Sequence, residues 1–166
     1  QTLRAGLFAT MMEPIMQQHR DKIAPEIIGT IERGLNLTPP QIFEAERIRI
    51  ELFKKILDFF ETHDFLICPA ASIAPFPVDQ RYVTEIDGKP CETYIDWFSI
   101  TFALTMTACP TISVPCGFTS EGLPVGVQIM GKPRGEASLL LVAKRFEQAI
   151  GISAKLPITP QKLKLV

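Results

Sequence analysis

Residues 108–131, "ACPTISVPCGFTSEGLPVGVQIMG", contain two runs rich in β-branched residues, joined by a short polar segment that ends in glycine. The run "PTISVPCGF" (110–118) predicts one strand and "LPVGVQIMG" (123–131) predicts a second, because β-branched side chains favour an extended backbone. The connecting "TSEG" (119–122) is short enough for the two strands to be antiparallel neighbours. We therefore expect a two-stranded hairpin in the last third of the chain.

The segment "TPPQIFEAERIRIELFKKILDFFETHDFLICPA" (38–70) predicts a long helix followed at once by a strand. Thr38 can cap this helix, and Gln41 stands three residues later, as in a capping box. Apolar residues then recur at helical spacing in one stripe, which consists of Ile42, Ala45, Ile48, Leu52, Ile56 and Phe59. The apolar run "DFLICPA" that follows is stopped by Pro69. A helix and a strand with almost no linker indicate an α/β fold.

Four further segments are expected to be helical. Residues 2–20 mix apolar and polar positions, with an interruption at Pro14, and "APEIIGTIERG" (24–34) is a shorter helix. The segment "IDWFSITFALTMTA" (95–108) predicts a buried helix. The last helix lies in residues 135–151, and its inward residues are expected to be Leu139, Leu140, Val142, Ala143, Phe146 and Ile150. The remaining residues 71–94 are dense in proline, glycine and aspartate and predict a long loop with a small hairpin around "IDGKP".

Bulk composition excludes several classes of function. The 166 residues fit a single domain or a partial domain spanning 1–166, and 17 basic against 18 acidic residues give a nearly neutral chain. The one basic cluster is the short "KLKLV" at the end, so we expect no direct nucleic-acid partner. Residues 97–120 carry no charge, but Pro110, Pro115 and the six hydroxyl side chains of residues 99–113 argue against a membrane span. We expect a cytoplasmic protein without membrane association.

The four cysteines, Cys68, Cys91, Cys109 and Cys116, form no C-x-x-C pair, and the two histidines are distant from them in sequence. A zinc site needs closer spacing of its ligands. We therefore expect no metal site and no cofactor, and we interpret the cysteines as buried free thiols in a reducing compartment.

A search for catalytic residues finds no complete set. None of the six serines has the tight glycine-rich setting of a nucleophile. His63 is at the end of the long helix, where it more simply complements the helix C-terminus. A pair of catalytic carboxylates would need a fixed separation. The carboxylates of the long helix fit a solvated face, and the sequence does not define the distance between those in the 71–94 loop. We therefore predict that this chain contains no catalytic residue.

The ordered segments nevertheless resemble the C-terminal third of the amidase signature family over roughly residues 20–151. The resemblance rests on "APEIIGTIERG", "FFETHDFLICPAASIAPFP", the hairpin "ACPTISVPCGFTSEGLPVGVQIMG", and "LLLVAKRFEQAIG". Its most distinctive part is the Gly-Leu-Pro-x-Gly-x-Gln motif at 122–128. Ala108 departs from the family pattern because it replaces a more usual glycine, and Thr105 stands near a position that is often Asn.

The resemblance implies an α/β fold in which helices cover a mixed β-sheet. It also implies hydrolysis or transfer of amides by a serine nucleophile, a bridging serine and a lysine, with backbone N–H groups holding the oxyanion. The Gly-Ser-Ser-Gly-rich segment that carries both serines has no counterpart in this sequence, and no lysine here matches the family's lysine motif. We therefore expect the C-terminal part of an amidase that is inactive alone and whose partner is the missing N-terminal half of the fold.

Residues 94–107 are the expected wall of the pocket for a small-molecule amide substrate, with Trp97, Phe98 and Phe102 as the candidate substrate-binding residues. The competing interpretation is core packing, since aromatic residues at helical spacing usually face the core. Two other functions stay open: a part of the amidase-like subunit of a glutamine-dependent aminoacyl-tRNA amidotransferase, and a non-catalytic binding or assembly module. A chain that exposes the faces of an incomplete fold is also expected to form homo-oligomers.

Overall fold

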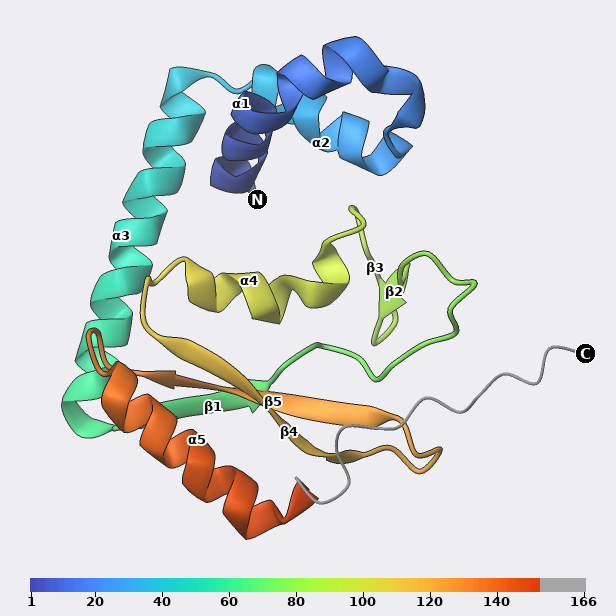
Figure 1. Cartoon of the computed structure of the whole chain (residues 1–166). Coiled ribbons are helices and arrows are strands. Elements are labelled where there is room, and N and C mark those ends of the chain that lie inside the picture. Colours follow the sequence, from blue (N-terminus) through green and yellow to red (C-terminus); the bar gives the residue numbers. More distant parts are fainter. Residues whose placement is uncertain (153–166) are drawn as a thin grey trace, which may run out of the picture.

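A computed structural model of the chain describes residues 1–152 of the 166. In chain order its main elements are α1 (Thr2–His19), α2 (Pro25–Leu35), α3 (Pro39–Thr62), β1 (Phe65–Pro69), β2 (Glu85–Ile86), β3 (Lys89–Pro90), α4 (Ser99–Thr105), β4 (Thr111–Phe118), β5 (Pro124–Gly131) and α5 (Glu136–Ile150). The elements lie in layers: the α1–α2 pair, then α4, then the sheet, then α5, with α3 along one side (Figure 1). The expected α/β class is confirmed.

The main sheet has three strands in the order β1-β5-β4. Strands β4 and β5 form the expected antiparallel hairpin, with Ser113 opposite Gln128. Strand β1 pairs with the other edge of β5, also antiparallel, and brings Cys68 opposite the same Gln128. Within residues 1–152, both strand pairings of this sheet are antiparallel. This part of the chain therefore shows no parallel pairing of the mixed sheet that is expected for the family fold.

Helix α5 covers one face of the sheet with apolar side chains. Val114 and Ile129 of the sheet form a buried cluster with Leu139 and Ala143 of α5, and the half-buried residues around it are Phe65, Ile112, Val127, Val142 and Phe146. The expectation that Leu140 faces inward is wrong, because this side chain is 60% exposed, and Ile150 at the helix end is also exposed. Leu140 is one residue, or about 100° of helix rotation, from Leu139, which turns it away from the sheet.

The opposite face of the sheet is covered by the end of α3 and by α4. Met130 of β5 is fully buried there with Phe60 and Cys109, and the half-buried residues around them are Phe53, Ile56, Phe59, Leu66 and Leu104. Upstream of Phe53 the expected inward stripe of α3 is only partly covered, since Ile48 is 53% exposed. The capping box is present at the start of α3, where the Thr38 N–H donates to Oε1 of Gln41 over 2.9 Å.

Helices α1 and α2 pack closely against each other around Ala9, Met16 and Ile31. A Cβ atom added to Gly34 would lie 2.0 Å from the carbonyl oxygen of Ala5, so only glycine allows this approach. The prediction that Pro14 interrupts the first helix is wrong, because α1 runs continuously through this residue. Proline inside a helix removes one backbone hydrogen bond, and packing against α2 offsets this loss.

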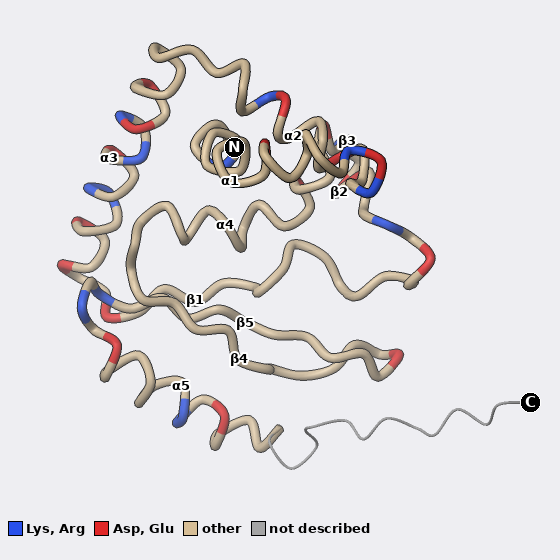
Figure 2. The backbone as a smooth tube through the Cα atoms, turned by 45° about the horizontal axis from the view of Figure 1, so that its top comes forward, with Lys and Arg blue, Asp and Glu red and all other residues tan. Residues whose placement is uncertain are grey.

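Charged side chains are absent from α4 and from the main sheet. Figure 2 shows Lys, Arg, Asp and Glu along α3, α5 and the β2–β3 hairpin, whereas α4 and the three strands of the main sheet carry none. The β2–β3 hairpin confirms the turn expected at "IDGKP", with Asp87 and Gly88 at positive φ as a two-residue turn requires. None of the helices within residues 1–152 has both the length and the apolar character needed to cross a bilayer.

Candidate functional site: the Trp97 cleft

The expected substrate-binding residues come from one short stretch, in which a single 3-10 turn, Asp96–Phe98, leads directly into α4. Their rings make a chain of edge-on contacts with Phe76 of the long loop. The ring centroids are 5.4 Å apart for Phe76–Trp97, 5.0 Å for Trp97–Phe98 and 6.0 Å for Phe98–Phe102. Such perpendicular contacts are a favourable geometry for aromatic pairs, so they hold the segment in one arrangement.

Trp97 lines an open cleft of about 570 Å³. The opposite walls are the chain leaving β1, residues 69–76, and the ends of the two hairpin strands. The lining is mostly apolar, and its polar side-chain groups are the Ser72 hydroxyl, the Cys116 thiol and the indole N–H of Trp97. Cys116 reaches it because the β4–β5 register skips this residue between Pro115 and Gly117, which is a bulge.

The three aromatic residues are not brought together into one site. Phe102 lines a different cleft, of about 590 Å³, between the start of α1, the middle of α3 and α4. Within the described residues Phe98 lines neither cleft and instead contacts the other two rings. All three side chains are half-buried, so none is a fully packed core residue.

Asp96 anchors the turn that precedes α4. Its carboxylate accepts hydrogen bonds from the N–H of Thr93 over 2.7 Å and from the Thr93 hydroxyl over 2.9 Å, and the Gln1 side chain also donates to it. Partial burial acts to raise the pKa of Asp96, but these hydrogen bonds outweigh it and hold the pKa below its ordinary value. The carboxylate thus fixes the backbone immediately before Trp97.

The sequence did not single out three other residues that line the Trp97 cleft, namely Ile73, Phe76 and the bulged Cys116. The signals that could have found them are weak: an aromatic residue between two prolines in "APFP", and a proline next to Cys116 inside a strand. Neither signal indicates which other segment the residue will face. Only the fold brings the 71–94 loop onto the hairpin.

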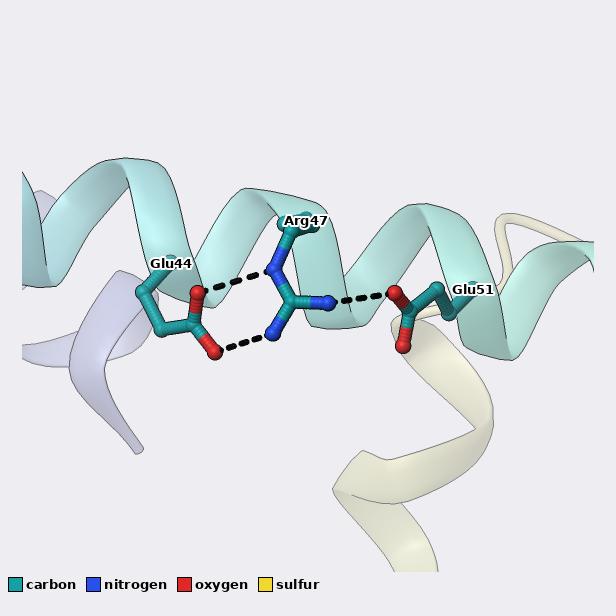
Figure 3. A network of polar contacts seen from close by, with 3 residues as sticks. All are labelled: Glu44, Arg47 and Glu51. Carbon is teal, nitrogen blue, oxygen red and sulfur yellow. Dashed lines mark hydrogen bonds and ion pairs between the residues drawn. The ribbon is translucent and has the colours of Figure 1, made fainter.

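The carboxylates of α3 lie on its solvated face, as expected. Arg47 lies between Glu44 and Glu51 and pairs with both over 2.5 Å (Figure 3). Hydrogen bonds from Arg47 lower the pKa of Glu44, while Glu44 and Glu51 raise the pKa of Arg47. A lowered pKa and an exposed position suit Glu44 to a helix surface and not to the role of a general acid.

His63 stabilises the end of α3, as the sequence predicted. Its Nδ1 lies 3.1 Å from the carbonyl oxygen of Phe59, and its ring stacks on the Phe59 ring at a centroid distance of 4.2 Å. The residue therefore complements the last turn of the helix. Within residues 1–152 no serine hydroxyl is hydrogen-bonded to a histidine or a lysine.

All four cysteines are free thiols in the structure, as expected. Cys109 is buried, and the others are half-buried. Burial raises the pKa of the Cys68 thiol, with a smaller opposing effect from the neighbouring Gln128 side chain. In the part of the chain that the structure describes, no three His, Cys, Asp or Glu side chains are grouped closely enough to hold a metal ion.

Comparison with known proteins decides the family. Residues 10–140 match the sequence profile of the family described as Amidase, which is well over half of the chain. The chain belongs to the amidase family. Its relatives include a glutamyl-tRNA(Gln) amidotransferase subunit from Thermodesulfovibrio yellowstonii, 36% identical over 74% of this chain, and an acylamidase from Rhodococcus erythropolis, 30% identical over 79%. The corresponding amidotransferase subunit from Alkaliphilus metalliredigens is 26% identical over 93% of the chain.

Solved structures show the same fold. A bacterial aryl acylamidase of the amidase signature family superposes with a TM-score of 0.77 over 93% of this chain, at 22% identity. The 6-aminohexanoate cyclic dimer hydrolase gives 0.77 over 95%, at 21% identity. The chain spans only 24–31% of the length of the three relatives above and 34–35% of these two structures. It therefore corresponds to about one third of an amidase fold.

Proposed function

We propose that this chain supplies the C-terminal part of an amidase and one wall of the pocket that receives the amide substrate. The observation that carries the proposal is the Trp97 cleft, an apolar cleft on a chain that belongs to the amidase family. Trp97 and Phe76 touch edge-on and both line it, so a flat or extended apolar group of a neutral amide can lie against this aromatic pair. In this proposal the serine nucleophile, the bridging serine and the lysine come from the rest of the fold.

The cleft can be tested directly because Trp97 is the single tryptophan of the chain. Titration of the full chain with benzamide or acetanilide is expected to change Trp97 fluorescence with a dissociation constant of about 1–10 mM, as such small ligands give. Phe76→Leu should weaken this binding, whereas Ile48→Ala, which changes the other cleft, should leave it unaltered. The absence of any saturable fluorescence change would contradict the proposed pocket wall.

The chain by itself is proposed to be inactive on amides. Purified full-length chain should show no amide turnover and no labelling by a serine-directed fluorophosphonate probe, because the catalytic segment of the family pattern has no counterpart in this sequence. Turnover that the same probe abolishes would overturn this part of the proposal.

The proposed partner is the remainder of an amidase fold, in the cytoplasm. Two kinds of feature in the described residues support it. Strands β1 and β4 each have one neighbour and leave an edge free, and Leu7 and Ile48 are exposed beside the Phe102 cleft. Light scattering of the chain alone should therefore detect homo-oligomers, and Leu7→Glu combined with Ile48→Glu should reduce them. A stable monomer that binds a specific ligand would instead favour the stand-alone binding module.

The second candidate function is part of a transamidating enzyme complex, and the amidotransferase relatives favour it. In that case the chain, joined to the rest of its fold, should co-purify with the other components of a glutamine-dependent tRNA amidation complex. An amidase without such partners would purify alone and hydrolyse amides. The two outcomes separate the candidates.

A further inference from the structure

A single buried side chain connects the two walls of the Trp97 cleft. Gln128 lies on the central strand β5 and is only 4% exposed. Its Nε2 donates to the carbonyl oxygen of Pro69 over 3.0 Å and to the carbonyl oxygen of Ile100 over 3.2 Å. Pro69 is the last residue of β1 and Ile100 lies in the first turn of α4. One amide group therefore joins three elements that are distant in sequence.

The chemistry of this contact requires an amide. Two carbonyl oxygens converge on one group, so that group must offer two hydrogens and carry no negative charge. A primary amide meets both conditions, whereas a carboxylate would face two acceptor oxygens and an aliphatic side chain would leave them without this donor. The buried position makes either replacement costly, because water does not readily substitute.

A second tether and a close backbone approach act in the same place. The Thr101 hydroxyl donates to the carbonyl oxygen of Ala70 over 2.7 Å, and the Ala70 N–H donates to the carbonyl oxygen of Gly126 over 3.0 Å. A Cβ atom on Gly126 would lie 3.1 Å from the carbonyl oxygen of Val114 and 3.5 Å from the Cβ of Ala70, so glycine keeps this approach open. The chain that leaves β1 is thus held to β5 by its backbone and to α4 by two side chains.

These tethers flank the cleft itself. Pro69, Ala70 and Gly126 line it on one side, and Trp97 lines the other side, three residues before Ile100. We propose that Gln128 is the positioning residue that sets the distance between Trp97 and the chain leaving β1, and hence the opening of the cleft. Its importance for substrate recognition rests on the proposed function, but the geometry can be tested without a ligand.

The test measures quenching of Trp97 fluorescence by acrylamide in the full chain, with circular dichroism as a check on folding. Gln128→Leu removes both donated hydrogen bonds, and the quenching constant should rise by about twofold or more as α4 detaches more often. Gln128→Glu should behave likewise at about pH 8 and return toward the native value near about pH 5, because its buried carboxyl, facing two carbonyl oxygens, has a raised pKa and donates one hydrogen bond when protonated. Gln128→Leu should show no such pH dependence.

Matched variants separate positioning from general loss of stability. Thr101→Val removes the second tether and should raise quenching by a smaller factor, while Thr105→Val, whose hydroxyl bonds within α4 to Phe102, should leave it unchanged. Leu139→Ala destabilises the opposite face of the sheet and should lower stability without raising quenching in the native chain.

The outcomes that overturn the proposal are distinct from those that overturn the proposed function. Unchanged quenching in folded Gln128→Leu and Gln128→Glu would overturn it. If both Gln128 variants fail to fold, equal quenching in Thr101→Val and Thr105→Val would overturn it, and a rise in Thr101→Val alone would support it. Failure of the native chain to bind small amides would contradict the proposed function and would leave the role of Gln128 unaffected.

Discussion

The two faces of the main sheet are covered by helices in different ways. On one face, α5 follows β5 directly and packs Leu139 and Ala143 onto Val114 and Ile129 with apolar contacts alone. On the other face, the first turn of α4 is held by hydrogen bonds from Gln128 and Thr101, and clefts open beside Trp97 and Phe102. Apolar contacts on both faces supply stability. The polar tethers, which occur on the α4 side, fix a position and leave space for a ligand or a partner.

The largest expected effect tests the apolar face. Ile129→Ala should lower the free energy of unfolding by about 3 kcal/mol, because it leaves a cavity at a fully buried position. Ile67 lies directly opposite on β1 and is 53% exposed, so Ile67→Ala should cost about 1 kcal/mol or less. Urea unfolding measures both, and equal losses would show that α5 does not form the closed core.

The contact between α1 and α2 is a third packing surface, and it is closed by the small residues Gly34, Ala5 and Ala9. Gly34→Ala should lower stability by about 2 kcal/mol, because its Cβ would collide with the backbone of Ala5 and force the helices apart. Gly29→Ala in the same helix meets no atom within 4 Å and should raise stability by about 0.5–1 kcal/mol. Thermal unfolding of the two variants should shift the midpoint temperature in opposite directions if Gly34 touches Ala5. Shifts of the same sign would contradict this contact.

The backbone turn after α4 can be tested at Ala108. Its φ of 52° is in the left-handed region, which explains why a glycine is more usual at this position in the family pattern. Ala108→Gly should stabilise the chain by about 0.5–1 kcal/mol, whereas Ala103→Gly inside α4 should destabilise it by about the same amount. Chemical denaturation distinguishes them, and a loss of stability in Ala108→Gly would contradict the left-handed turn after α4.

The smallest effect concerns the turn before Trp97. Since the folded pKa of Asp96 lies below its ordinary value of about 3.9, its contribution to stability is present above that value and is lost as the pH falls through the folded pKa. Asp96→Asn should therefore reduce the acid dependence of stability and increase quenching of Trp97 at neutral pH. Asp79→Asn, an exposed carboxyl in the long loop, is the control and should change neither.

Local signals in the sequence predicted much of the fold. The β4–β5 hairpin, the capping box at Thr38, the Asp-Gly turn and the role of His63 each depend on residues within a few positions of one another. Two of the errors have a shared cause. The exposure of Leu140 and Ile48 depends on which faces of a helix meet another element, which apolar spacing does not reveal when both faces carry apolar residues.

The candidate site could be predicted only in part. The substrate-binding roles of Trp97, Phe98 and Phe102 stay a prediction, as does the extent of the domain over 1–166. The structure places Trp97 and Phe102 in separate clefts and leaves Phe98 between them. Nothing in the segment 95–108 distinguishes these three positions, because each is an aromatic residue on the same short turn and helix.

The sequence by itself determined the family and the secondary structure, since both are encoded in short contiguous motifs such as the Gly-Leu-Pro-x-Gly-x-Gln segment at 122–128. Only the tertiary structure decided what the last residue of that motif does. Gln128 bonds to carbonyl oxygens 59 and 28 residues away, at Pro69 and Ile100. Folding alone brings these backbone groups together, and the amide matches them because two buried acceptors require a neutral group with two donor hydrogens.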